Sequence, residues 1–488
     1  MRQSSLLFAL IVSFAALSGC SHPPEGLQRH PNVLLIILDT VRADRLSCYG
    51  YVRPTTPALD SLAAEGIRFE RCYANSSWSL PSHASIFTGM YAAGHRATQE
   101  TLKLPAGPPT LAELLGTAGY QTFASSANPV VSVASGLARG FDTFIEAYRR
   151  EYRNPTGADL GHVNSVAFKR FLESSETTRP FFAFFNYIEA QTPYDPPEPF
   201  RSRFVDPSIP ERRVVSATKL EVPDHYMDGP LTPDEISILG QLYDAEVSSL
   251  DSYVRELLDI LRHDGRLGNT LVVIASDHGE NLGEHGHFGH VFSIHNTLLH
   301  VPLILLFPAG EHTGEVRTDV VQLLDLFPTI LHYCGVESGD RPEGRDLFGK
   351  GSGASGRVAM AEYYYPRQVF SVFDRKKLEE NQKRFVPFMR RLRAVQDETF
   401  KLIWGSDGSF ELYRTADDPY ELHDLMGGEH QQPQARRLLS TLHNLVDTYH
   451  GDTPLDPPPP VGWMVPGFEE RAAGPEMLEK LLTLGYIK

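Results

Sequence analysis

Three polar segments of the chain carry residue types that could perform chemistry together. Asp39 ends an apolar run at residues 33–38, and Asp277 and His278 follow a second run at residues 271–275. Two carboxylates and an imidazole can bind a divalent cation, and hard oxygen ligands favour calcium, magnesium or manganese. Because a lone aspartate at a strand end usually caps a helix, the metal-site hypothesis rests on the combination.

The second segment, residues 79–83, reads Ser-Leu-Pro-Ser-His. A serine at the start of a helix is usually a cap, and Pro81 suits the first helical turn. The alternative interpretation is that Ser79 is a nucleophile at a helix N-terminus. There the helix dipole and the free amides favour an anionic ester.

The third segment, residues 277–290, holds four histidines and three acidic residues among several glycines. Its glycines argue against a regular helix, and its imidazoles and carboxylates suggest a metal or anion site. A solvated polar loop is the alternative. The segment directly follows an apolar run, and this position favours a functional site.

The elements that must position these residues form an alternating pattern. Apolar runs long enough for buried strands occur at residues 33–38, 181–187, 271–275 and 301–307. Helical patterns lie between and after them, at residues 110–118, 233–261 and 322–334. The clearest begins at a predicted Thr232 cap, with Pro233 and Glu235 completing a capping box. This alternation predicts an α/β sheet, with Asp39 and Asp277 at carboxyl strand ends, where sites gather.

The sequence predicts two folded regions and a globular protein. Its 488 residues are 41% hydrophobic and carry a net charge of −16, which excludes a disordered chain and a basic nucleic-acid binder. We assign residues 31–345 to a catalytic domain and residues 346–488 to a smaller subdomain. A Gly-rich linker at 349–353 and short alternating runs at 392–395 and 401–404 predict a small antiparallel sheet there.

The N-terminus predicts a lipoprotein of the cell envelope. Arg2 precedes a short apolar run, and residues 17–20 resemble a bacterial lipobox. Residues 1–19 would be the signal peptide, Cys20 the lipidated residue anchored in the membrane, and residues 20–30 a tether. Ser21 favours the periplasmic face of the outer membrane, and a secreted or periplasmic protein is the alternative. The remaining cysteines are expected to be small buried residues rather than a disulfide framework: Cys48, Cys72 and Cys334.

Taken together, these motifs resemble the sulfatase family of the alkaline-phosphatase-like superfamily. The resemblance runs from about residue 31 to the C-terminus, through residues 32–44, 79–83, 276–280, 301–304, 325–329 and 412–425. It implies an α/β fold with a large, mostly parallel mixed sheet flanked by helices, followed by the smaller antiparallel subdomain. It also implies a metal-dependent hydrolase of sulfate esters, small or glycan in nature.

The resemblance assigns roles to individual residues. Ser79, or a formylglycine made from it by a maturation enzyme, would be the nucleophile, with His83 and His290 as further catalytic residues. One divalent cation would be held by Asp39, Thr40, Asp277, His278 and Ser79; calcium is favoured, with manganese or zinc as alternatives. Substrate would be bound by Asn128, Gln191 and His287.

Several residues depart from the family pattern and keep alternatives open. Thr40 stands where many sulfatases have a second aspartate, as in phosphodiester and phosphonate hydrolases or phosphoglycerol transferases. His83 and His290 replace an arginine and a lysine, and Gln191 replaces a histidine that can act as a general acid. The alternatives are therefore a phosphodiester or phosphonate hydrolase, a phosphoglycerol-type transferase, and a non-catalytic protein that binds glycans.

Overall fold

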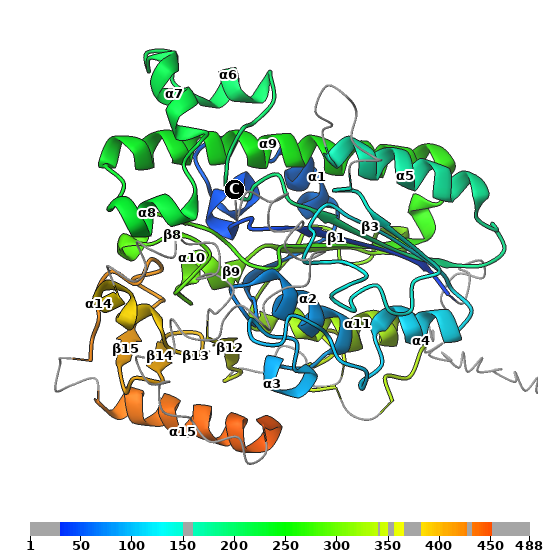
Figure 1. Cartoon of the computed structure of the whole chain (residues 1–488). Helices are drawn as coiled ribbons and strands as arrows, with labels where there is room; N and C mark the ends of the chain where they lie inside the picture. Colours follow the sequence, from blue (N-terminus) through cyan, green and yellow to red (C-terminus); the bar gives the residue numbers. More distant parts are fainter. Residues whose placement is uncertain are drawn as a thin grey trace, which may run out of the picture.

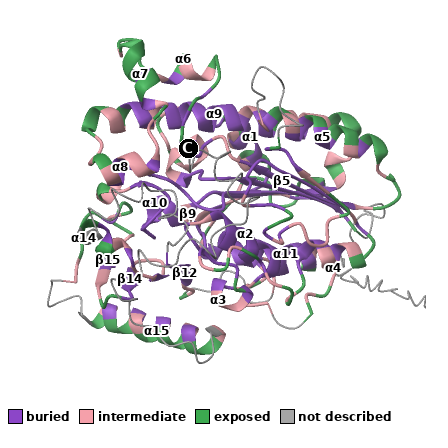
Figure 2. Ribbon diagram, in the orientation of Figure 1, coloured by how far each residue is buried: buried purple, intermediate pink, exposed green. Residues whose placement is uncertain are grey.

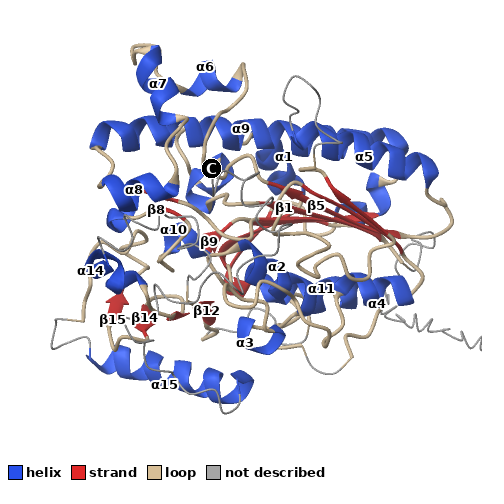
Figure 3. Ribbon diagram, in the orientation of Figure 1, coloured by secondary structure: helices blue, strands red, loops and turns tan. Residues whose placement is uncertain are grey.

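The computed structural model describes residues 30–149, 160–339, 342–349, 356–365, 382–426 and 432–450. A nine-stranded sheet runs through the centre between two layers of helices (Figures 1 and 3). Its order is β11-β2-β10-β6-β1-β5-β3-β4, and β9 pairs with β2. The strands are β1 (Asn32–Leu38), β2 (Ile67–Tyr73), β3 (Gln121–Ser126), β4 (Thr143–Glu146), β5 (Phe181–Tyr187), β6 (Thr270–Ala275), β9 (His300–Val301), β10 (Leu303–Leu306) and β11 (Glu315–Gln322).

Strand β1 shows why the centre of the sheet is apolar on both faces. It pairs in parallel with β5 and with β6, and every one of its residues is buried. Side chains alternate between the faces of a strand, so Val33, Leu35 and Ile37 join one core while Leu34 and Ile36 join the other. Burying each such side chain contributes about 1.5–3 kcal/mol.

Helices cover both faces of this sheet. One face carries α1 (Pro57–Glu65), α5 (Leu160–Ser174) and α9 (Pro233–Asp264), and the other carries α2 (Ser79–Thr88), α4 (Leu111–Thr117) and α11 (Leu326–Tyr333). In Figure 2 the sides of α5 and α9 that meet the sheet are buried and their outer sides are exposed, whereas α2 is buried throughout. The remaining helices of this region are α3 (Ala92–His95), α6 (Phe200–Phe204), α7 (Glu211–Ala217), α8 (Val222–Asp228) and α10 (Asn296–Leu299).

Helix α9 begins as the sequence predicts. Thr232 and Glu235 form a reciprocal capping box, with Pro233 in the first turn. Asp251 of α9 also contacts the start of α1, because its carboxylate accepts hydrogen bonds from the backbone N–H groups of Ala58 and Leu59 at 2.9 Å. A side chain of α9 therefore caps α1 and fixes the two helices against each other.

A second, four-stranded antiparallel sheet lies beside the first, as expected for the smaller subdomain. Its order is β12-β13-β14-β15, and helix α15 packs on it through Leu438, Leu442 and Val446. Its elements are β12 (Ala359–Tyr363), α14 (Gln382–Phe385), β13 (Leu392–Gln396), β14 (Lys401–Gly405), β15 (Phe410–Tyr413) and α15 (Gln432–His450).

Two expected elements differ from those observed. The run 301–307 forms two short strands, β9 and β10, because Pro302 interrupts it, and both pair antiparallel to their neighbours. The helix expected over 322–334 is a 3-10 turn at Leu323–Asp325 followed directly by α11 from Leu326; Gln322 ends β11 and, as the N-cap of the 3-10 turn, forms a capping box with Asp325.

Other expectations concern cysteines and the ends of the chain. Cys48, Cys72 and Cys334 are free in the described part, as expected; Cys72 and Cys334 are also buried, whereas Cys48 is only half-buried. The described helices include none that is long and apolar enough to cross a membrane. The expected signal peptide, Cys20 and most of the linker lie outside the described residues.

Candidate active site

Four adjacent parallel strands deliver polar residues to one edge of the large sheet. Asp39 follows β1, Asp277 and His278 follow β6, Asn128 follows β3, and Asn186 lies near the end of β5. These strands are neighbours in the order β6-β1-β5-β3, so their carboxyl ends meet. The sheet itself therefore gathers residues that are more than 200 positions apart in the chain.

Asp39, Asp277 and His278 form a group that could hold a metal ion. One ligand atom of each lies within 4.8 Å of those of the other two, and all three side chains are fully buried. Asp277 Oδ1 accepts hydrogen bonds from the N–H groups of Thr40 (3.3 Å) and His278 (2.9 Å). Asp277 Oδ2 has no hydrogen-bond partner among the described residues. A buried carboxylate oxygen without a donor is suited to a cation.

The electrostatics of the three residues agree with a cation site. Burial, together with the neighbouring Asp277, raises the pKa of Asp39 to about 7, and burial raises the pKa of Asp277 to about 7. Burial also lowers the pKa of His278 to about 4, so this imidazole is neutral at pH 7. Its Nδ1 lies 2.9 Å from the carbonyl of Gly279, which leaves Nε2 to face the carboxylates. The donors thus fit a divalent cation.

Ser79 lies directly beside this group. It is the first residue of α2, and its Oγ lies 3.2 Å from His278 Nε2 and 3.4 Å from Asp39 Oδ1. Trp78 occupies the N-cap position, and Ser79 Oγ bonds to these site residues rather than to the start of its own helix. The hydroxyl is thus directed at the metal-site residues.

Two asparagines support the nucleophile and the first carboxylate. Asn128 Nδ2 donates to Asp39 Oδ2 at 2.6 Å and to Ser79 Oγ at 3.2 Å. Asn186 Oδ1 accepts from the backbone N–H of Asn128, and its Nδ2 donates to Asp39 Oδ2 at 3.4 Å. Sequence reasoning missed Asn186. Its signal was a single amide in the otherwise apolar and aromatic run 181–187.

His83 lies one helical turn after Ser79 and contacts its backbone. Its Nδ1 donates to the carbonyl of Ser79 at 2.8 Å, and its Nε2 lies 3.4 Å from Asn186 Nδ2. Burial lowers the pKa of His83 to about 3, so the ring is neutral. Both ring nitrogens therefore have protein partners, and the ring ties the first turn of α2 to the sheet edge.

His290 and Gln191 meet at the other side of His278. The rings of His290 and His278 lie 4.7 Å apart, and His290 Nε2 lies 3.3 Å from Gln191 Nε2. His290 Nδ1 lies 3.1 Å from Glu280 Oε1. Burial raises the pKa of Glu280 to about 8 and lowers that of His290 to about 4. The structure thus brings Gln191 and His290 together.

Thr40 and His287 occupy different surroundings. Thr40 has a φ of 61°, and its hydroxyl donates to the carbonyl of Asp39 at 2.7 Å. Its contact with the metal group is made by its backbone N–H. His287 Nδ1 lies 3.2 Å from the Tyr226 hydroxyl, and its ring contacts Phe388. Its contacts are therefore with α8 and the small subdomain.

A second group of possible metal ligands comprises His285, His295 and Glu421. Their polar atoms already have protein partners: His285 Nε2 contacts the carbonyl of Tyr420, and Glu421 forms a buried ion pair with Lys401 at 2.7 Å. The two imidazoles stack at 3.7 Å, nearly parallel, which does not direct their lone pairs at one ion. This group is best explained as a contact between the two sheet regions.

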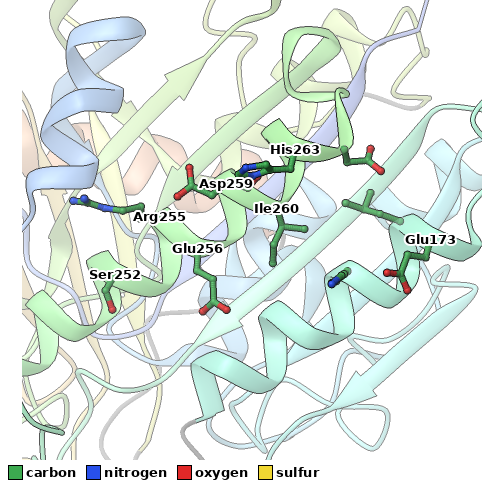
Figure 4. Close-up of a pocket in the computed structure, with 10 residues that line it drawn as sticks. Glu173, Ser252, Arg255, Glu256, Asp259, Ile260 and His263 are labelled. Atoms are coloured by element: carbon green, nitrogen blue, oxygen red, sulfur yellow. The ribbon is translucent and has the colours of Figure 1, made fainter.

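A groove between α5 and α9 lies away from these residues (Figure 4). Its α9 side extends to Asp259 and Asp264, which precede β6 and so lie toward the amino end of that strand. Asp277 lies at the opposite, carboxyl end. The groove carries charges of both signs, including Arg255 and Glu256, and does not share a residue with the site.

Several curated relatives of this chain are named sulfatases. N-acetylglucosamine-6-O-sulfatase of Bacteroides thetaiotaomicron is 25% identical, covering 91% of this chain and 92% of its own. Human iduronate 2-sulfatase is 26% identical over 63% of this chain and 69% of its own. An arylsulfatase of Clostridium perfringens is 24% identical over 65% of this chain and 77% of its own.

Solved structures confirm the fold. Phosphonate monoester hydrolase of Agrobacterium radiobacter has a TM-score of 0.70 and 22% identity, covering 86% of this chain and 96% of that one. A protein solved with its substrate D-glucosamine-2-N,6-O-disulfate has a TM-score of 0.66 and 21% identity, covering 88% and 99%. The expected alkaline-phosphatase-like α/β fold is therefore confirmed.

Family models cover both regions of the chain. The model of the N-sulphoglucosamine sulphohydrolase C-terminal region matches residues 283–448. The model named Sulfatase matches residues 31–336, which is more than half of the chain and contains every residue of the site described above. On this match, together with the metal-ligand group and Ser79 at the sheet edge, the chain belongs to the sulfatase family.

Proposed function

We propose that this sulfuric ester hydrolase cleaves sulfate esters of sugars, with Ser79 or a formylglycine derived from it as the nucleophile. The observation that carries the proposal is the position of Ser79 Oγ. Ser79 is the first residue of a ten-residue helix, and its Oγ lies 3.2 Å from His278 Nε2 and 3.4 Å from Asp39 Oδ1. A hydroxyl in this position can attack an ester whose charged group meets the cation site and the helix N-terminus.

The cation would be held by Asp39, Asp277, His278 and the Ser79 oxygen. We propose calcium, with manganese or zinc as alternatives, because two carboxylates supply hard oxygen ligands beside one imidazole. When bound, it would neutralise charge on the transferred group and lower the pKa of the nucleophile. Thr40 would support the site through its N–H bond to Asp277.

The remaining residues would bind and orient. Asn128 holds the Ser79 oxygen and Asp39 in one geometry through its two hydrogen bonds. His278 Nε2 carries the free lone pair of its ring, since Nδ1 faces a carbonyl, and would offer it to the cation beside the Ser79 oxygen. His290 and Gln191 lie beside His278, where they can contact the ester. His83 keeps Ser79 in place through the Ser79 carbonyl. His287 is proposed to bind more distant parts of a substrate.

The names of the relatives support a glycan substrate. One relative is an N-acetylglucosamine-6-O-sulfatase and another an iduronate 2-sulfatase, and one structural neighbour was solved with a disulfated glucosamine. We infer that the substrate here is likewise a sulfated sugar.

Thr40 gives a specific reason to test a second activity, the hydrolysis of phosphodiesters or phosphonates. With Thr40 in place of a second aspartate, the site has one carboxylate fewer than many sulfatases, a pattern that resembles the phosphodiester and phosphonate hydrolases of the superfamily. Turnover of an aryl sulfate and of a phenylphosphonate ester by the same preparation, compared as kcat/KM, decides between the two.

We also propose a lipid anchor at Cys20 and a location on the periplasmic face of the outer membrane, based on the lipobox-like residues 17–20. Cys20→Ala is expected to release the protein into the soluble periplasmic fraction. Its continued presence in the membrane fraction would contradict the anchor.

The test of the nucleophile is the mass of the tryptic peptide spanning residues 72–96, from protein made in its own host. Conversion of Ser79 to formylglycine by a maturation enzyme removes two hydrogens, or about 2 Da. Ser79→Ala should abolish turnover of sulfate esters while leaving cation binding measurable. An unmodified peptide with an active enzyme would favour the serine itself and phosphoryl transfer. Full activity in Ser79→Ala would reject the proposed nucleophile. Ligand binding without turnover in the wild type would favour a glycan-binding protein.

A further inference from the structure

We infer that Glu280 is a positioning residue that holds the His290 ring so that Nε2 meets the ester. The inference rests on the proposed function, in which His290 contacts the substrate. It concerns a carboxyl group that belongs neither to the proposed metal ligands nor to the nucleophile.

The local backbone explains why these two residues meet. Strands β7 (Asn281–Leu282) and β8 (Phe288–Gly289) form a two-stranded antiparallel hairpin with Asn281 opposite Gly289. Extending this register by one position places Glu280 opposite His290. Residues directly opposite each other on antiparallel strands have Cβ atoms about 4.5–5.5 Å apart, which suits a contact between their side chains.

The contact itself is buried and short. His290 Nδ1 lies 3.1 Å from Glu280 Oε1, and the two side chains are 1% and 0% exposed. A histidine fixed at one ring nitrogen by a carboxylate presents the other nitrogen to its reaction partner. Here the contact at Nδ1 leaves Nε2 as the nitrogen that faces Gln191 and the site.

Neighbouring groups restrict the ring from its other sides. The His278 ring lies 4.7 Å away at an interplanar angle of 35°, and Gln191 Nε2 lies 3.3 Å from His290 Nε2. Without Glu280 the ring could turn about its Cβ–Cγ bond and exchange the nitrogen that faces the ester. The Glu280 carboxyl group therefore selects one of the two orientations of the His290 ring. The register of the hairpin places this carboxyl group opposite the ring.

A double-mutant cycle in the metal-loaded, full-length enzyme tests this role. Glu280→Ala, His290→Ala and the double variant are compared with the wild type for an aryl sulfate and an alkyl sulfate. Cation content is measured for each variant, because Glu280 lies two residues from His278. Glu315→Ala is the matched control: it removes a carboxylate 2.7 Å from a different histidine, His312, outside the site.

Glu280→Ala should lower kcat by about 10- to 100-fold with KM changed less than about threefold, at unchanged cation content. In the His290→Ala background the same substitution should cost less than about threefold, because no ring remains to be positioned. Glu280→Gln keeps the volume and one hydrogen bond, and should retain more activity than Glu280→Ala. Glu315→Ala should leave kcat and KM near the wild-type values.

An equal loss from Glu280→Ala in both backgrounds would overturn the inference, because it would show that Glu280 acts independently of His290. A loss explained by missing cation would overturn it as well. Failure of the proposed function has a different signature, since the wild type would then hydrolyse neither ester. In that case the ¹⁵N signals of the His290 ring, assigned by their absence in His290→Ala, still test the inference: they should shift in Glu280→Gln and not in Glu315→Gln.

Discussion

At the scale of single residues, the site is a pair of buried carboxylates that lack a positive partner of their own. Asp39 and Asp277 are fully buried, and the described contacts around them are amides, hydroxyls and neutral imidazoles. Burying an unpaired charge costs several kcal/mol, so a fold keeps such a pair only for a ligand that neutralises it.

The pH dependence of stability should reveal this pair in the metal-free protein. The folded pKa of Asp39 and of Asp277, about 7, lies above the ordinary value of 3.8. The folded state therefore holds more protons than the unfolded state between about pH 4 and 7, so stability falls as pH rises through this window. Urea unfolding in EDTA should give a lower free energy of unfolding at pH 8 than at pH 5. Cation affinity should change in the opposite sense, since binding requires ionised carboxylates.

Asp277→Asn separates cation binding from folding. Asparagine Oδ1 can still accept the N–H groups of Thr40 and His278, so the fold should persist. Cation affinity should fall at least about 100-fold, and the metal-free variant should be more stable than the metal-free wild type at pH 8, by about 1–3 kcal/mol. Calorimetry of calcium and manganese binding and urea unfolding measure the two effects. The exposed Asp234→Asn is the control, and unchanged affinity in Asp277→Asn would reject the ligand assignment.

At the scale of elements, the sequence predicted those whose signals are local. The apolar run of β5 and the capping box of α9 were found at their observed positions. The direction of β10 was missed, because pairing depends on neighbours far along the chain. Asn186 and the proposed role of Glu280 were missed for the same reason. The position of Asn186 in the site depends on the strand order β1-β5-β3, and the contact of Glu280 depends on the register of a hairpin whose strands have two residues each.

The β7–β8 hairpin provides a prediction at this scale. Gly289 has a φ of 77°, and a Cβ there would lie 2.5 Å from Val222, whereas Gly286 has a φ of 72° and open space around it. Alanine at either position costs about 1–2 kcal/mol of backbone strain. Only Gly289→Ala should also displace His290, lowering kcat by at least about tenfold. Thermal unfolding and kinetics of both variants test this, and equal activities would show that hairpin placement does not matter.

At the scale of the whole molecule, the small subdomain contacts the chain segment that follows His290. Lys401 of β14 forms an ion pair with Glu421, and both side chains are 0% exposed. Lys401 Nζ also donates to the carbonyl of Ile294 and to Asn296 Oδ1, and Glu421 accepts from the Asn296 N–H. Residues 294–296 are thus held against the small subdomain, and they follow His290 by four to six positions in the chain.

This connection predicts a loss of stability that reaches the site. Glu421→Gln leaves the buried Lys401 ammonium without its counter-charge, so it should cost about 3–5 kcal/mol. Pairing it with Lys401→Met should restore part of that loss, because the unpaired charge is removed. Breaking the exposed pair Arg414–Asp417 with Asp417→Asn should cost at most about 1 kcal/mol of stability.

Urea unfolding measures the loss of stability in each variant, and kcat shows whether the segment after His290 has moved. The kcat value should fall in Glu421→Gln, recover partly in the double variant and stay unchanged in Asp417→Asn. Equal costs for the buried and exposed pairs would mean that the subdomain does not support the catalytic region through this contact.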